Sequence, residues 1–151
     1  MNYNRNEIIN QLNGGLPIGK NGERVRWCTP ISDLESISEV FHKENNIANH
    51  VFFGKKEVFS GIKLGLYTPF DTKRDNNGSE KLNHLGQNLN IEDVEPLISK
   101  ITCMIGEPDE KNDDYGVYRK WILDEFEITI FPRSHHGSDW NAILIENMKC
   151  L

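Results

Sequence analysis

The fold is decided by the stretch VYRKWILDEFEITIF, residues 117–131. Apolar and polar side chains alternate on both sides of Asp124-Glu125, which is the pattern of two half-buried strands joined by a tight turn. A third alternating stretch, residues 140–146, follows a polar segment at 132–139. The C-terminal part of the chain therefore predicts a three-stranded antiparallel meander.

The segment before this meander predicts an amphipathic helix at about residues 93–105. Its apolar side chains recur every three or four positions, which places on one face Val94, Leu97, Ile98, Ile101, Met104 and Ile105. Asp93 stands where a capping residue is expected, and Pro96 is expected inside the first turn. Gly106 and Pro108 are residues that commonly end a helix.

The first half of the chain predicts helices and short strands. One helix is expected from Asn4 to Gly14, because a capping pattern opens the segment and glycines close it. A second helix is expected to begin at Pro30 or Ser32 and to end at Asn45, with apolar residues along one side.

Residues 51–67 are rich in β-forming side chains and interrupted by glycines, which predicts two strands with a turn near Lys55-Lys56. Residues 68–90 are expected to form a long loop. Helices come first and a meander closes the chain, so the predicted fold class is α+β. No repeat or linker divides the sequence, and residues 1–151 are expected to form a single domain.

Composition narrows the function classes. The chain has 151 residues and a formal net charge of −6, which disfavours direct, sequence-independent binding of nucleic acid. No apolar run approaches the roughly 20 residues that cross a bilayer, and no signal peptide opens the chain, so no membrane role is expected. Cys28, Cys103 and Cys150 are odd in number and lack metal-ligand spacing. We therefore expect free thiols, a cytoplasmic protein, and neither a metal nor a cofactor.

Two motifs invite a catalytic interpretation. Residues 14–20 have the spacing GxxxxGK of a phosphate-binding loop, but a helix precedes them and Asn21 replaces the Ser or Thr that would hold magnesium. The 134–139 loop carries His135, His136 and Asp139, which could serve a hydrolase or a metal-dependent enzyme if other segments supplied partners. A polar connection between two strands is the simpler explanation of that loop.

The charge distribution is more informative. Residues 91–127 carry 11 acidic and four basic side chains, so the net negative charge of the whole chain lies in this segment. Helix and turn positions that favour acidic residues account for part of this excess. The rest suggests a surface that attracts a basic partner. The candidate partner-binding residues are Asp109, Glu110, Asp113, Asp114, Tyr115, Asp124 and Glu125.

One pattern in the C-terminal part of the chain comprises residues 105–109 (Ile-Gly-Glu-Pro-Asp), Asp114-Tyr115, Trp121, and strands ending at Ile143 and Ile145. This pattern resembles that of small bacterial immunity proteins. Those proteins protect a cell from the toxin domains of contact-dependent inhibition and related polymorphic toxin systems. The resemblance implies an acidic cytoplasmic protein, not an enzyme, that binds one toxin tightly and masks its active site.

The acidic segment would suit a nuclease toxin, whose nucleic-acid substrate requires a basic cleft. The leading hypothesis is therefore an immunity protein that neutralises a basic toxin domain. The alternatives are a small hydrolase built on the 134–139 loop, and a regulatory or phage-encoded binding module with another protein partner. The sequence does not indicate an oligomeric state.

Overall fold

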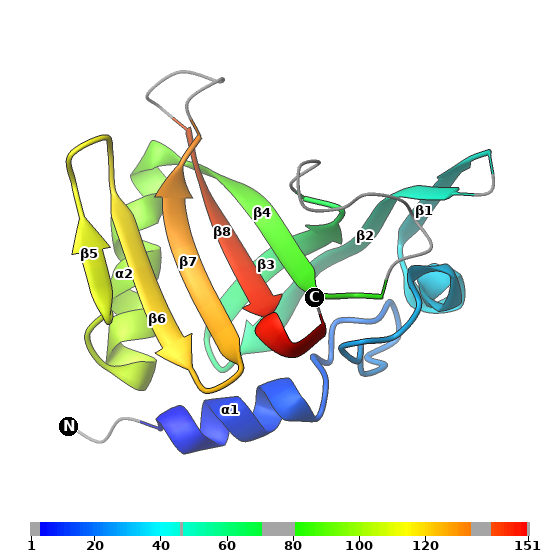
Figure 1. The fold of residues 1–151 in the computed structure, drawn as a ribbon, viewed down its shortest axis with the longest axis horizontal. Coiled ribbons are helices and arrows are strands. Elements are labelled where there is room, and N and C mark those ends of the chain that lie inside the picture. The colour runs from blue at the N-terminus through cyan, green and yellow to red at the C-terminus, as the bar shows by residue number, and fades with distance from the viewer. Residues whose placement is uncertain (1–3, 46, 71–80, 134–139, 151) are drawn as a thin grey trace.

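A computed structural model describes residues 4–45, 47–70, 81–133 and 140–150 (Figure 1). The fold is α+β, with one open antiparallel sheet of eight strands and a long helix across one face (Figure 1). The elements of the described residues are α1 (Arg5–Asn13), the 3-10 helix η1 (Ile31–Ile37), β1 (Val40–Glu44), β2 (Ile47–Phe59), β3 (Ile62–Thr68), β4 (His84–Asn90), α2 (Ile91–Ile105), β5 (Glu110–Asn112), β6 (Tyr118–Leu123), β7 (Phe126–Pro132), β8 (Trp140–Asn147) and the 3-10 helix η3 (Met148–Cys150).

The strands lie in the order β1-β2-β3-β4-β8-β7-β6-β5. β8 pairs along its whole length with β4 on one side and β7 on the other. In the described residues, by contrast, β3 and β4 pair at a single position, Tyr67 opposite Gly86. The sheet therefore consists of two well-paired parts that meet at one narrow junction.

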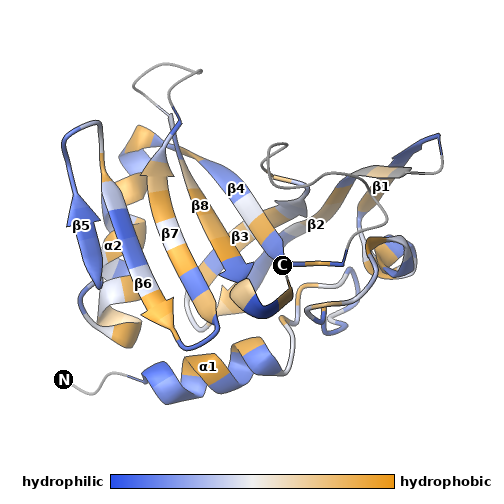
Figure 2. Cartoon of the chain, viewed as in Figure 1, coloured by the Kyte–Doolittle hydropathy of each residue, from blue (hydrophilic) through white to orange (hydrophobic). Residues whose placement is uncertain are grey.

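The hydrophobic core lies between α2 and the sheet. α2 buries its apolar face, which comprises Val94, Leu97, Ile98, Ile101 and Ile105. Alternate side chains of the strands meet it, among them Ile128 and Ile130 of β7 and Ile143 and Ile145 of β8. Each fully buried Ile or Leu stabilises the fold by roughly 1.5–3 kcal/mol. Figure 2 shows the resulting contrast between the hydrophobic β7 and the hydrophilic edge strand β5.

The α+β class and the C-terminal meander are confirmed, with the β6–β7 turn at Asp124-Glu125 as expected. The helix is confirmed too, but it begins at Ile91, with Asn90 as its N-cap. Asp93 therefore lies within the first turn and does not cap. Pro96 is the sixth residue and lies outside the first turn, so one backbone hydrogen bond of the helix is missing at that position.

The second predicted helix is wrong over most of its length. Helical geometry ends at Ile37 in η1, and Val40–Glu44 is instead the edge strand β1, paired with β2. Val and Phe have high β propensity, and the long β2 offers a backbone partner that the sequence pattern could not reveal. Val40, assigned to the buried side of the predicted helix, is 38% exposed.

Two predictions about the middle of the chain also need correction. The β2–β3 turn is at Ser60-Gly61, where Gly61 has φ 79°, and not at Lys55-Lys56. A register shift between Phe52 and Lys55 explains the break in the pattern that suggested a turn there. The predicted 68–90 loop contains β4, whose polar Gln and Asn residues obscured a strand paired with β8.

The expectation of free thiols is wrong for two of the three cysteines. Cys28 and Cys150 form a disulfide with a Cα–Cα distance of 5.3 Å, which ties the C-terminal η3 to the segment before η1. Cys103 is free, as expected, and exposed. In the described part of the chain, no helix is long and apolar enough to cross a membrane. The cytoplasmic location was expected because all three cysteines were expected to be free thiols. The disulfide removes that support.

Candidate functional site

The predicted acidic residues are divided between the two ends of β6. Asp113, Asp114 and Tyr115 lie in the loop that enters β6, whereas Asp124 and Glu125 form the turn that leaves it (Figure 1). A six-residue strand spans about 20 Å at about 3.4 Å per residue. The seven candidates therefore do not form one continuous patch.

Three of these carboxylates are paired with basic side chains. Asp109 Oδ2 lies 3.2 Å from Arg5 Nη1, and Glu125 Oε1 lies 3.3 Å from Lys149 Nζ. Asp113 Oδ1 accepts a hydrogen bond of 2.6 Å from Arg119 Nη1. This bond holds the pKa of Asp113 below its usual range. These pairs reduce the negative charge that Asp109, Asp113 and Glu125 present to a partner.

The other three candidate carboxylates have no ion pair among the described residues; they are Glu110, Asp114 and Asp124. The side chain of Tyr115 is 92% exposed, which is unusual for a large aromatic residue in a folded domain. Tyr115 also borders a surface cavity of about 430 Å³ beside the outermost strand β5. We call this cavity the β5 hollow, and its lining residues are Glu110, Lys111, Asn112, Tyr115, Gly116, Tyr118 and Pro132.

The backbone around the β5 hollow is fixed by a close contact. Gly116 has φ 123°, and a Cβ atom there would lie 2.9 Å from Cβ of Pro132. Any other residue at this position would be strained and would push β7 away from the loop. Asp114 N–H is held by Asn112 Oδ1 at 2.8 Å. The loop therefore presents Tyr115 from a defined backbone.

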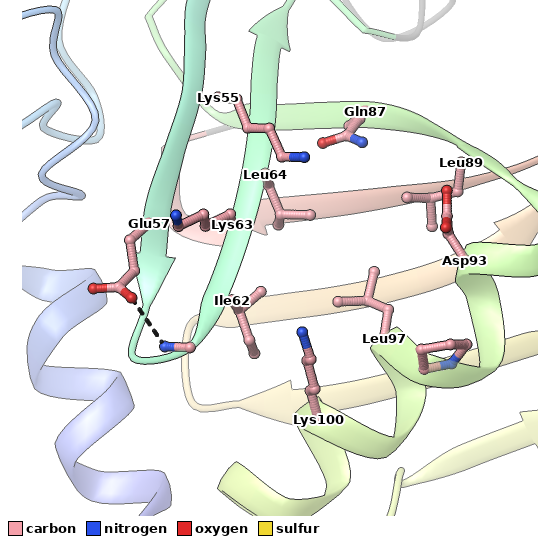
Figure 3. Close-up of a pocket in the computed structure, with 12 residues that line it drawn as sticks. Lys55, Glu57, Ile62, Lys63, Leu64, Gln87, Leu89, Asp93, Leu97 and Lys100 are labelled. Carbon is pink, nitrogen blue, oxygen red and sulfur yellow. Dashed lines mark hydrogen bonds between the residues drawn. The ribbon is translucent and has the colours of Figure 1, made fainter.

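A second cavity was missed by the sequence reasoning. It has a volume of about 480 Å³ and lies between the β2–β3 hairpin, β4 and α2 (Figure 3). We call it the lysine groove, and its lining residues are Lys55, Glu57, Gly61, Ile62, Lys63, Leu64, Gln87, Leu89, Asp93, Pro96, Leu97 and Lys100. No local motif could have predicted it, because its residues come from four elements.

A row of rings forms a third feature. His50 lies 5.3 Å from Tyr67, and Tyr67 lies 5.1 Å from Phe70, measured between ring centroids. The guanidinium of Arg133 lies 4.6 Å above the Phe70 ring. Burial lowers the pKa of His50, and the nearby His42 lowers it further. Burial raises the pKa of Tyr67, while Arg133 opposes that shift.

The structure describes one of the two motifs considered for catalysis. Ser134, His135, His136 and Asp139 lie outside the described residues. Within the described ranges, no three His, Cys, Asp or Glu side chains gather to hold a metal. Residues 14–20 pass from the end of α1 into a turn that a Leu16–Val25 bridge closes. The strand–loop–helix of a phosphate-binding loop does not form there.

Comparison of the chain with protein-family models, with curated proteins and with solved structures found no match in any of the three. The function proposed below therefore rests on this chain's own residues.

Proposed function

We propose that this protein is a non-enzymatic inhibitor, an immunity protein that binds one basic toxin domain and masks its active site. The toxin is proposed to be a nuclease, because a basic active-site cleft is complementary to an acidic inhibitor. The observation that carries the proposal is the 92% exposed Tyr115 beside the unpaired carboxylates of Glu110 and Asp114.

The β5 hollow has the chemistry of a receptor for a lysine or arginine side chain. Glu110 lines the hollow, and Asp114 is the exposed residue directly before Tyr115 in the chain, so both supply negative charge at or near it. Tyr115 and Tyr118 supply ring faces that attract cations. Lys111 weakens this charge but is itself exposed and long enough to turn away. Aromatic residues next to charge are typical of the few residues that dominate binding energy at protein interfaces.

The position of the hollow also favours a protein partner. β5 is the outermost strand of the sheet and has three residues, all exposed. Its outer side is open to a partner strand or loop, and its short, charged sequence limits uncontrolled pairing with other copies. An inhibitor needs such a surface, which is accessible but does not aggregate.

The proposal can be tested by capturing partners from the native host with the tagged protein, at low and then moderate salt. We expect one basic protein in stoichiometric amount, released as salt rises, whose nuclease activity the purified protein inhibits. A basic partner without toxic activity would indicate the alternative, a regulatory binding module. Absence of any partner at both salt concentrations would contradict the proposal.

The compartment proposed with this function is the cytoplasm, where a nuclease toxin acts. Thioredoxin and glutathione keep thiols reduced there. The Cys28–Cys150 disulfide is therefore the observation that opposes this compartment. Fractionation of the native host tests it: recovery of the protein outside the cytoplasm would make the proposed compartment wrong, while the proposed binding surface would be unaffected.

A further inference from the structure

We propose that the lysine groove binds a small organic monoanion, a carboxylate head group on a short apolar chain. This proposal does not depend on the proposed inhibitor function, because the groove and the β5 hollow share no lining residue.

The groove exists because the sheet opens between β3 and β4. β3 is paired with β2 along its length, but within the described residues its backbone pairs with β4 at one position, Tyr67 opposite Gly86. Further along, Gly65 N–H is satisfied by the side-chain Oε1 of Gln87 at 2.7 Å in place of a backbone carbonyl. α2 starts directly after β4 and closes the opened wedge from one side (Figure 3).

Positive charge predominates in the groove. Lys55, Lys63 and Lys100 are exposed, and none of them has an ion pair among the described residues. In Figure 3 the amino groups of Lys55 and Lys100 extend into the space between β3 and α2. The amino group of Lys63 extends the other way, over β2, so the ammonium groups of Lys55 and Lys100 are the two that face this space. An anion between these two groups would be attracted by both.

The two carboxylates of the groove set the charge of the ligand. Glu57 accepts a hydrogen bond of 3.2 Å from Gly61 N–H, so it is held at the hairpin end. Asp93 lies beside Leu89 at the other end (Figure 3). The three lysines and two carboxylates that line the groove carry one net positive charge. A monoanion neutralises that charge, whereas a dianion would leave the occupied groove with a net negative charge.

The apolar part of the ligand is indicated by the inner surface of the groove. Ile62, Leu64, Leu89 and Leu97 line it, and each is less than a tenth exposed. The aliphatic stems of the lysines extend this apolar surface outward. The volume of about 480 Å³ falls in the range of roughly 300–1,000 Å³ that small-molecule sites occupy. An inorganic anion alone would leave the exposed aliphatic stems of Lys55 and Lys100 uncovered.

The proposal is tested with sodium octanoate as the probe, followed by amide chemical-shift changes in the full-length protein. We expect saturable shifts confined to the groove residues of β2, β3, β4 and α2. Acetate, which lacks the chain, and octylammonium, which has the opposite charge, should leave those amides unchanged. Shifts outside the groove, or equal responses to octylammonium, would overturn the proposal. Tighter binding of octyl phosphate than of octanoate would overturn the assignment of a monoanion.

Paired variants separate the groove lysines from general surface charge. Lys55→Gln/Lys100→Gln should weaken octanoate binding about fivefold, because the two amino groups that face the groove are removed and surface charge pairs contribute up to about 1 kcal/mol each. Lys20→Gln/Lys81→Gln makes the same charge change at exposed positions outside the groove and should bind octanoate as the wild type does. Equal weakening in both pairs would overturn the site. The spectrum of each variant reports directly that it is folded, and Lys63→Gln, whose amino group extends away from the groove, should bind octanoate nearly as the wild type does.

Discussion

Arg5 Nη1 lies 3.2 Å from Asp109 Oδ2, so residues 104 positions apart in the sequence form an ion pair. The same guanidinium donates hydrogen bonds to the backbone carbonyls of Ile105, Glu107 and Ile122. Arg5 thus joins α1 to the end of α2 and to β6. It also neutralises Asp109, which explains why a carboxylate expected in a partner-binding patch instead stabilises the fold.

Replacing Arg5 with alanine should therefore destabilise the protein. Three backbone carbonyls and one carboxylate lose a charged donor, and we expect the free energy of unfolding to fall by about 1.5–3 kcal/mol. Urea denaturation measures this change. Arg26→Ala, at an exposed arginine, serves as the control and should change stability by less than about 0.5 kcal/mol. Equal effects of the two substitutions would contradict the role given to Arg5.

The Cys28–Cys150 disulfide should contribute to stability because it closes a loop with a sequence separation of 122 residues. The double variant Cys28→Ser/Cys150→Ser is expected to lose about 2–4 kcal/mol relative to the oxidised wild type. Reduction of the wild type should lower the thermal midpoint to that of the variant. Cys103→Ser, which alters the exposed free cysteine, is the control. An oxidised wild type no more stable than the double variant would rule out this contribution.

Gly86 is expected to tolerate no side chain. A Cβ atom at this position would lie 2.5 Å from Cγ of the buried Phe70, at the junction where β3 meets β4. Gly86→Ala should cost about 1–3 kcal/mol through overpacking. Gly14→Ala provides the comparison, because its nearest heavy atom would be 3.5 Å away and the change should be close to neutral. Thermal unfolding of both variants distinguishes a steric effect from a general effect of added alanine.

The stability of the protein should fall in mild acid partly because of His50. Its pKa in the folded protein is lowered from 6.5, first by burial and then by His42. The unfolded chain therefore binds more protons as the pH drops from about 6.5 toward the folded value, and stability is lost across that window. His50→Phe keeps the ring contact with Tyr67 and removes the titration.

Unfolding in urea at about pH 7.5 and pH 5.5 tests this prediction, since the interval spans the ordinary titration range of histidine. We expect a smaller loss of stability in His50→Phe than in the wild type. His42→Gln should give an intermediate loss, because it removes one of the two causes of the shift. If His50→Phe lost as much stability as the wild type, titration of His50 would not contribute.

Local sequence patterns predicted the C-terminal half of the fold well. The alternation on either side of Asp124-Glu125 and the regular apolar spacing from Val94 to Ile105 both come from burying one face of an element, so the pattern and the structure have the same physical cause. The patterns failed where distant pairing decides the outcome. Val40–Glu44 becomes a strand because it pairs with β2, and His84–Asn90 becomes a strand because it pairs with β8.

The candidate surface could be predicted in part. Exposure of Asp114 and Tyr115 follows from a polar segment between a helix and a hairpin. The pairing of Asp109 with Arg5 and of Asp113 with Arg119 depends on tertiary contacts, and no local pattern could have predicted the first of them. The lysine groove arises from a gap between two strands and could be found in the structure alone.

The central claim is that Glu110 and Asp114 draw a basic partner to the β5 hollow. The most direct test is the association rate of the captured partner, measured against salt concentration, with wild type and with Glu110→Gln/Asp114→Asn. Electrostatic steering predicts that the double variant associates at least about tenfold more slowly at low salt and depends less on salt. Glu7→Gln/Asp33→Asn makes the same charge change at exposed positions of α1 and η1, outside the hollow, and should keep the wild-type rate and salt dependence. Unchanged association in Glu110→Gln/Asp114→Asn, or equal slowing in both double variants, would contradict the claim.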